Sequence, residues 1–124
     1  MQTYHGCENF APKGKFTITD TFTCTSTNLI YCIQCLKCQK LYIGETMRRL
    51  ADRSTEHLKS ITDKNIHLPV AVHFNQPDHS ITDYSIFGLK LTQHTEHRKQ
   101  LEKRLIFRLH TTQPHGINLK FSYI

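Results

Sequence analysis

The sequence predicts a small α/β domain in which a mixed, mostly antiparallel three-stranded sheet is flanked by helices. Two runs rich in β-branched and aromatic residues, 28–34 and 40–44, are separated by a short turn, a pattern typical of a β-hairpin. A third run of this kind covers residues 84–91. Segments with helical spacing follow the second and third runs, so we expect strands and helices to share one layered core.

The length and composition of the chain limit its class. A chain of 124 residues can form one hydrophobic core and is too short for two domains. Hydrophobic residues make up 38% and charged residues 21%, which is typical of a globular protein and excludes a disordered one. No apolar run approaches the roughly 20 residues of a membrane span, so we expect no membrane partner. The N-terminus lacks the apolar segment of a secretory signal.

Charge and cysteine usage indicate the partner and the compartment. The formal net charge is +6, which favours a polyanionic partner, with nucleic acid as the first choice. The nine histidines favour metal binding or acid–base chemistry. Five cysteines without an export signal are not a disulfide framework, so we expect a reduced, nuclear or intracellular compartment.

The first half of the chain divides into an arm, a hairpin and a helix. Residues 1–23 are polar and rich in threonine, and we expect them to form an arm or linker that enters a domain of residues 24–124. The turn Cys35–Cys38 joins the first two strands. A helix is predicted from Thr46 to about Ile61, because apolar residues recur there at helical spacing. These residues are Met47, Leu50, Ala51, Leu58 and Ile61.

The second half begins with a loop at residues 62–82, which contains two prolines and a short helix near 70–74. The strand at 84–91 follows, and then a second amphipathic helix from Thr95 to about His110. Its inward-facing residues are Leu101, Leu105, Ile106 and Leu109. Pro114 ends this helical region, since proline cannot continue a helix.

Two tyrosines, Tyr31 and Tyr42, lie on the adjacent predicted strands. A tyrosine hydroxyl can donate, accept or relay a proton, although its ordinary pKa is about 10. Tyrosines in strands are more often core residues or cross-strand pairs. Taken alone, this pair therefore favours packing over catalysis.

Arg53 and His57 are four residues apart on the first predicted helix, a spacing that places both on one face. A guanidinium can bind two phosphate oxygens while an imidazole moves a proton. Arg48, Arg49 and Lys59 lie nearby, and they favour an ordinary solvated helix face. For this pair alone, the solvated face is the stronger interpretation.

Glu102 lies beside the apolar stripe of the last predicted helix, at the edge of the core. Mg²⁺ is usually bound by one or two carboxylates together with phosphate oxygens and waters, so Glu102 is a candidate ligand. The alternative is an ion pair with Arg98 or Lys99.

Cys35 and Cys38 form a Cys-x2-Cys turn. His73 and His79 come later in the sequence, and one predicted helix lies between the two pairs. Two thiolates and two imidazoles are a common ligand set for tetrahedral Zn²⁺, so we predict a structural zinc site. Buried thiols with surface histidines, or a redox pair, are the alternatives, but a redox pair prefers a helix N-terminus. His67 is a competing ligand.

Together these motifs resemble the GIY-YIG endonuclease domain, in the version carried by Penelope-like retroelements. The resemblance covers roughly residues 24–122. Leu29-Ile30-Tyr31 stands where the family has GIY, with Leu29 in place of glycine, and Tyr42-Ile43-Gly44 matches YIG. The other matching residues are Arg53 and His57 of the first helix, Glu102 of the last helix, Asn118 of the closing segment, and Cys35, Cys38, His73 and His79 of a CCHH zinc motif.

The resemblance implies that the chain nicks DNA by hydrolysing phosphodiester bonds during retroelement integration, with no small-molecule cofactor. Glu102 would hold a catalytic Mg²⁺ or Mn²⁺, and Tyr31 would activate water with His57 as proton acceptor. Tyr42 and Arg53 would position the phosphate, and Asn118 would orient the site. The base could be any of Tyr31, Tyr42 or His57. The alternatives are a catalytically inactive DNA-binding domain and a zinc-stapled interaction domain.

Overall fold

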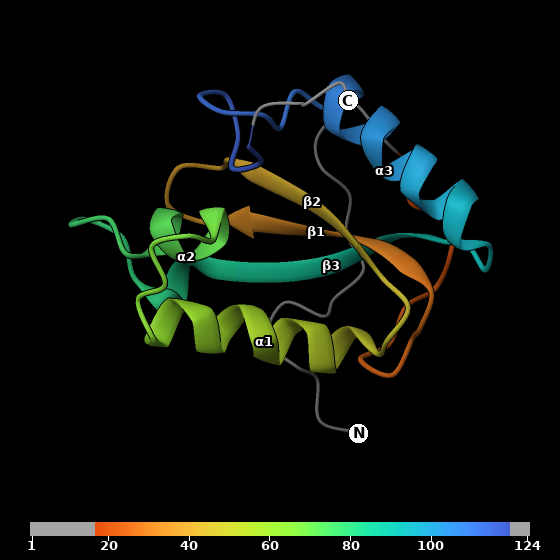
Figure 1. Cartoon of the computed structure of the whole chain (residues 1–124), viewed down its shortest axis with the longest axis horizontal. Coiled ribbons are helices and arrows are strands. Elements are labelled where there is room, and N and C mark those ends of the chain that lie inside the picture. Colours follow the sequence, from red (N-terminus) through yellow and green to blue (C-terminus); the bar gives the residue numbers. More distant parts are fainter. Residues whose placement is uncertain (1–16, 120–124) are drawn as a thin grey trace.

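The computed structural model describes residues 17–119 and contains a three-stranded antiparallel sheet with helices on both faces (Figure 1). The predicted α/β fold class is confirmed. The elements in chain order are β1 (Leu29–Cys35), β2 (Leu41–Thr46), α1 (Leu50–Thr62), α2 (Pro69–Phe74), the 3₁₀ turn η1 (Ile81–Asp83), β3 (Tyr84–Leu91) and α3 (Thr95–Arg108).

The sheet has the order β2-β1-β3, so β1 is the central strand and β2 is an edge strand. The turn at Cys35–Cys38 closes the β1–β2 hairpin, as predicted, with Tyr31 opposite Gly44 and Ile33 opposite Tyr42. β1 is buried on both faces, which explains why its sequence is a continuous apolar run rather than an alternating one.

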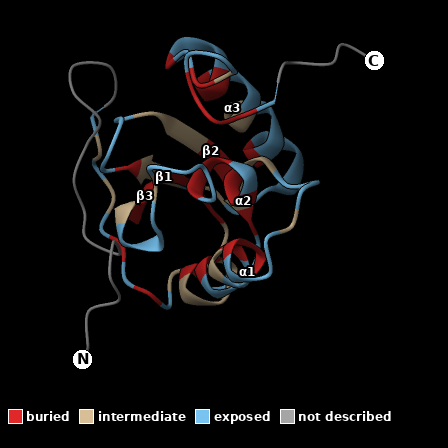
Figure 2. Ribbon diagram, turned by 90° about the vertical axis from the view of Figure 1, so that its left-hand side faces the viewer, coloured by how far each residue is buried: buried red, intermediate tan, exposed pale blue. Residues whose placement is uncertain are grey.

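Apolar side chains fill the space on each side of the sheet. Alternate residues of β1, beginning with Leu29, pack with α1 and α2, and the intervening residues, beginning with Ile30, pack with α3. Figure 2 shows these buried residues between the helices, with α3 on one face of the sheet and α1 on the other. Side chains carried by α1 and by α3 can therefore meet only around an edge of the sheet.

The first helix begins at Leu50, and the prediction that it begins at Thr46 is wrong. Thr46 pairs with Leu29 as the last residue of β2, and its hydroxyl accepts a hydrogen bond from the backbone N–H of Arg48. Met47, which fits the helical spacing in the sequence, is 61% exposed in this connection. The strand pairing overrides the local helical pattern here.

Residues 17–23 lie against β3. Phe22 is buried, and a Cβ atom added to Gly88 would lie 2.2 Å from its ring, so glycine makes room for the phenylalanine. The carboxylate of Asp20 accepts a 2.8 Å hydrogen bond from the backbone N–H of Leu91. Residues 1–16 of the predicted arm and residues 120–124 of the predicted domain lie outside the described part. None of the helices in residues 17–119 has the length and hydropathy that a bilayer crossing requires.

Candidate active site and cysteine–histidine cluster

Tyr31 and Tyr42 lie on the face of the sheet that α1 covers. Tyr31 is fully buried, and its hydroxyl end crosses β2 over Gly44. A Cβ atom at Gly44 would lie 2.4 Å from both Cζ and the hydroxyl oxygen of Tyr31, far inside van der Waals contact. The glycine of the Tyr42-Ile43-Gly44 motif is therefore required for the close approach of the Tyr31 side chain.

His57 joins the two tyrosines. The hydroxyl of Tyr31 lies 2.7 Å from Nε2 of His57. The imidazole meets the rings of Tyr31 and Tyr42 edge-on, each at a centroid distance of 5.6 Å. Because His57 is buried, it belongs to the inner side of α1, and the interpretation of Arg53 and His57 as a simple solvated face is wrong for His57.

Burial keeps these three side chains uncharged near neutral pH. It raises the pKa of Tyr31 well above its ordinary value, while the nearby Arg53 acts in the opposite direction. Burial also raises the pKa of Tyr42. The pKa of His57 falls to about 3, first because of burial and then because of the positive charge of Arg53. The pair of Tyr31 and His57 is thus a neutral hydrogen-bonded unit.

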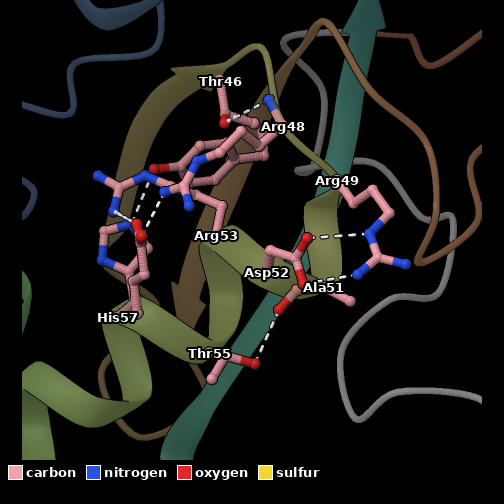
Figure 3. A network of polar contacts seen from close by, with 10 residues as sticks. Thr46, Arg48, Arg49, Ala51, Asp52, Arg53, Thr55 and His57 are labelled. Atoms are coloured by element: carbon pink, nitrogen blue, oxygen red, sulfur yellow. Dashed lines mark hydrogen bonds and ion pairs between the residues drawn. The ribbon is translucent and has the colours of Figure 1, made fainter.

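Arg53 lies beside this unit with 29% of its side chain exposed. Its Nη1 donates a 3.0 Å hydrogen bond to Oε1 of Glu56, and Glu56 also pairs with Arg48 (Figure 3). Glu56 belongs to none of the motifs in the sequence, although its spacing of three residues from Arg53 is a helical ion-pair signal. Glu56 holds two guanidiniums at one end of the site.

A pocket of about 240 Å³ opens next to these residues. Its lining residues are Tyr42, Arg53, Glu56, His57, Ser60, Leu68, Pro69 and Val70. Basic, phenolic and imidazole groups thus face one cavity beside the edge strand, an arrangement that can bind an anionic group such as a phosphate.

Glu102 approaches from the opposite face of the sheet, on α3. After the larger effect of burial, its negative charge also raises the pKa of Tyr42. Burial, and next the like charge of Glu45, raise the pKa of Glu102 to about 7. A bound cation would relieve this unfavourable burial of negative charge, so the position suits a divalent metal ion.

The predicted alternative, an ion pair of Glu102 with Arg98 or Lys99, is not found within residues 17–119. Arg98 forms its ion pair with Glu45, at 2.7 Å between Nε and Oε1, and within residues 17–119 no ion pair engages Glu102. Glu45 directly follows the Tyr42-Ile43-Gly44 motif, and the sequence alone assigned it no role.

Asn118 acts through the backbone of β2. Its Oδ1 accepts a 2.8 Å hydrogen bond from the N–H of Ile43, and its Nδ2 donates a 3.0 Å hydrogen bond to the carbonyl of the same residue. The hydroxyl of Thr111 donates to the same Oδ1 at 2.7 Å. Because these bonds hold the strand between Tyr42 and Gly44, Asn118 can orient the site without entering the pocket.

The two cysteines and two histidines predicted to bind zinc lie together. The candidate ligand atoms of Cys35, Cys38, His73 and His79 are all within 4.8 Å of one another. Sγ of Cys38 is 3.5 Å from Nε2 of His73, close to the roughly 3.5 Å between a sulfur and a nitrogen in a tetrahedral zinc site. The cysteines are free thiols, so the group could hold a metal ion.

Asp78 orients one of the two histidines. Its Oδ1 lies 2.9 Å from Nδ1 of His79, while the opposite ring nitrogen, Nε2, is buried without a hydrogen bond to the described residues. A carboxylate behind a histidine is a frequent arrangement at metal sites, because it fixes the ring and leaves the other nitrogen to the metal. The competing ligand, His67, is exposed and lies outside the group.

A search of solved structures connects this architecture to a known one. The catalytic domain of the homing endonuclease I-TevI matches with a TM-score of 0.62 and 17% sequence identity, over 74% of this chain and 97% of that chain. The chain has the GIY-YIG fold. No protein-family model matches the sequence, and a search of curated proteins finds no match. At this identity the GIY-YIG fold alone is established, so activity must be argued from the site.

Proposed function

We propose that this chain is a DNA endonuclease that hydrolyses phosphodiester bonds with one divalent cation. The observation that carries the proposal is the 2.7 Å contact of Tyr31 with His57 beside a pocket that His57, Tyr42 and Arg53 line. The charge of Glu102, on the opposite face of the sheet, acts on Tyr42 of the edge strand β2. The homing endonuclease catalytic domain of the same fold supports it. The net charge of +6 suits a polyanionic substrate.

The residues around the pocket bind and orient the scissile phosphate. Mg²⁺ or Mn²⁺, when bound at Glu102, supplies Lewis-acid stabilisation of the phosphate and of the leaving 3′ oxygen. The guanidinium of Arg53 faces the pocket and neutralises phosphate oxygens, and Glu56 limits its conformations. Tyr42 also lines the pocket, and its hydroxyl would donate a hydrogen bond to the same group.

Tyr31 and His57 accept the proton of the attacking water and transfer it between them. His57 lines the pocket and Tyr31 lies behind it. Once water reaches the Tyr31 hydroxyl, the 2.7 Å contact would let Tyr31 take a proton from that water while it gives its own to Nε2 of His57. The low pKa of free His57 disfavours this transfer in the empty pocket. A bound phosphate places negative charge next to the imidazole and raises its pKa, so the substrate itself prepares the acceptor.

We also assign zinc to the Cys35, Cys38, His73 and His79 group, as a structural ion. Two thiolates and two imidazoles match the preference of zinc, and four protein ligands leave no open position for catalysis. The resemblance to Penelope-like retroelement domains further supports a role in nicking target DNA for integration, in a reduced, nuclear or intracellular compartment.

Cleavage of supercoiled plasmid tests the proposal. Glu102→Ala should abolish Mg²⁺-dependent nicking and leave the thermal unfolding temperature within a few degrees of the original. Glu96→Ala is the matched control, since Glu96 is an exposed glutamate in the first turn of the same helix. Nicking that persists in Glu102→Ala would remove Glu102 from its role. Tight, salt-dependent DNA binding without nicking by the unaltered chain would favour the inactive DNA-binding alternative.

A further inference from the structure

Arg98 is fully buried, and it has the largest side chain among the fully buried residues within 17–119. Its guanidinium donates to Oε1 of Glu45 at 2.7 Å and to the carbonyl of Thr92 at 3.1 Å. It also donates to the hydroxyl of Thr95 at 3.2 Å and to Oδ1 of Asn28 at 3.4 Å. These partners belong to β2, to the connection between β3 and α3, to α3 itself and to the residue before β1.

A buried ion pair contributes little net stability, because removing both charges from water offsets most of their attraction. An apolar residue in place of Arg98 would fill the same space at a lower desolvation cost. The arrangement is directional, however, since a guanidinium must meet its acceptors at defined angles. α3 also packs on the sheet through the apolar residues Leu105 and Ile106, and through Leu109 directly after the helix. Such apolar contacts tolerate small displacements.

The ion pair connects the two halves of the candidate active site. Glu102 lies one helical turn after Arg98, so both side chains project from neighbouring positions of α3. Glu45 is adjacent to Gly44, over which the Tyr31 hydroxyl lies. The bond between Glu45 and Arg98 therefore ties the part of β2 that adjoins the tyrosines to the turn of α3 that precedes Glu102.

We propose that the Glu45–Arg98 ion pair fixes the position of α3 along β2 and thereby holds the Glu102 carboxylate beside this edge strand, which makes both residues positioning residues of the nuclease. The inference rests on the proposed function. A displacement of a catalytic group by about 1 Å can lower a rate by about 100-fold, so small shifts of α3 would be visible in catalysis.

Two substitutions of Glu45 separate positioning from charge. Glu45→Gln and Glu45→Ala both remove the negative charge beside Glu102, but only Glu45→Gln keeps an oxygen that can accept from Nε of Arg98. With saturating Mg²⁺ and DNA, we expect kcat for nicking by Glu45→Ala to fall at least about tenfold below that of Glu45→Gln. KM for DNA should change less than about twofold, since neither variant alters a residue that lines the pocket.

A second pair of variants distinguishes a loss of positioning from a loss of folding. Arg98→Met replaces the guanidinium with an apolar side chain, and Leu109→Ala weakens the packing of the same helix without touching the ion pair. At a temperature where each variant is fully folded by circular dichroism, Arg98→Met should lose at least about tenfold in kcat. Leu109→Ala should stay within about threefold of the unaltered chain.

The outcomes separate this inference from the function on which it rests. Equal rates for Glu45→Gln and Glu45→Ala beside an active unaltered chain would overturn the positioning role alone. Equal rates for folded Arg98→Met and Leu109→Ala would do the same. Absence of metal-dependent nicking by the unaltered chain would overturn the proposed function, and the positioning role with it.

Discussion

The hydroxyl of Tyr31 and the Nε2 atom of His57 lie 2.7 Å apart in the interior of the protein, although 26 residues separate them in the sequence. The contact joins the central strand β1 to the helix α1. Because burial disfavours a charge on either group, the two side chains share a proton without carrying a net charge.

Tyr31→Phe should remove the proton relay and keep the fold. The change deletes one buried hydroxyl, so we expect a loss of roughly 1–2 kcal/mol in the free energy of unfolding. The rate of metal-dependent nicking should fall by about 100-fold or more, the usual range for loss of a general base. Tyr84→Phe is the matched control, because the Tyr84 hydroxyl also bonds to α1, at 2.8 Å from the hydroxyl of Ser54, but outside the site. Equal activity of the two variants would contradict the role of Tyr31.

His57 should make the protein sensitive to mild acid. Its pKa is about 3 when folded and near 6.5 when unfolded, so between these values the unfolded chain binds the extra proton. Its contribution to stability is present above pH 6.5 and is lost as the pH falls towards 3. Between pH 7 and pH 5 we expect a loss of about 2 kcal/mol from this group.

Urea unfolding of the original chain and of His57→Gln at both pH values, with zinc saturating, measures this loss. The pH dependence should be weaker in His57→Gln by about 2 kcal/mol, since other titrating groups contribute equally to both proteins. Parallel pH profiles would show that His57 titrates normally in the folded protein.

Gly44→Ala should displace the Tyr31 side chain, because the added Cβ would lie 2.4 Å from its hydroxyl oxygen. We expect a loss of roughly 1–3 kcal/mol in the free energy of unfolding, together with a fall in kcat of at least about tenfold. Gly88→Ala is the control, because Gly88 pairs with Tyr31 from the other neighbouring strand, but its Cβ would lie 2.2 Å from the ring of Phe22, a residue outside the candidate site. If Gly44→Ala and Gly88→Ala are equally destabilised in thermal unfolding, and if kcat for nicking falls equally in both folded variants, the glycine at position 44 has a structural role only.

Cys35→Ser should lose zinc and stability together. Atomic emission is expected to find one zinc per original chain and none in the variant, with the free energy of unfolding lower by several kcal/mol. Cys32→Ser is the control, because Cys32 is a buried thiol on the same strand but outside the ligand group. Nicking should also fall in Cys35→Ser, because the ligands Cys35 and Cys38 lie in the turn between the strands that carry Tyr31 and Tyr42. A full complement of zinc in Cys35→Ser would remove this residue from the ligand set.

The local pattern of the sequence predicted most of the secondary structure, and the resemblance to the GIY-YIG domain singled out most of the candidate site residues. The strand at 84–91 and the hairpin turn were predicted at the positions observed, because alternation, turn residues and helical spacing are properties of neighbouring residues. The spacing of two cysteines and two histidines likewise predicted the cluster that the fold assembles.

The tertiary structure decided what these residues do. Helix α1 begins after Thr46 because that residue pairs with Leu29 of β1, a contact that no local pattern contains. Arg98 resembles a surface base in the sequence, yet it is buried on Glu45 rather than paired with Glu102. These two contacts join residues 17 and 53 positions apart in the chain, and their energies arise only when the sheet brings those segments together. The sequence therefore determined which groups are available, and packing around β2 decided which of them share a hydrogen bond, a charge or a pocket.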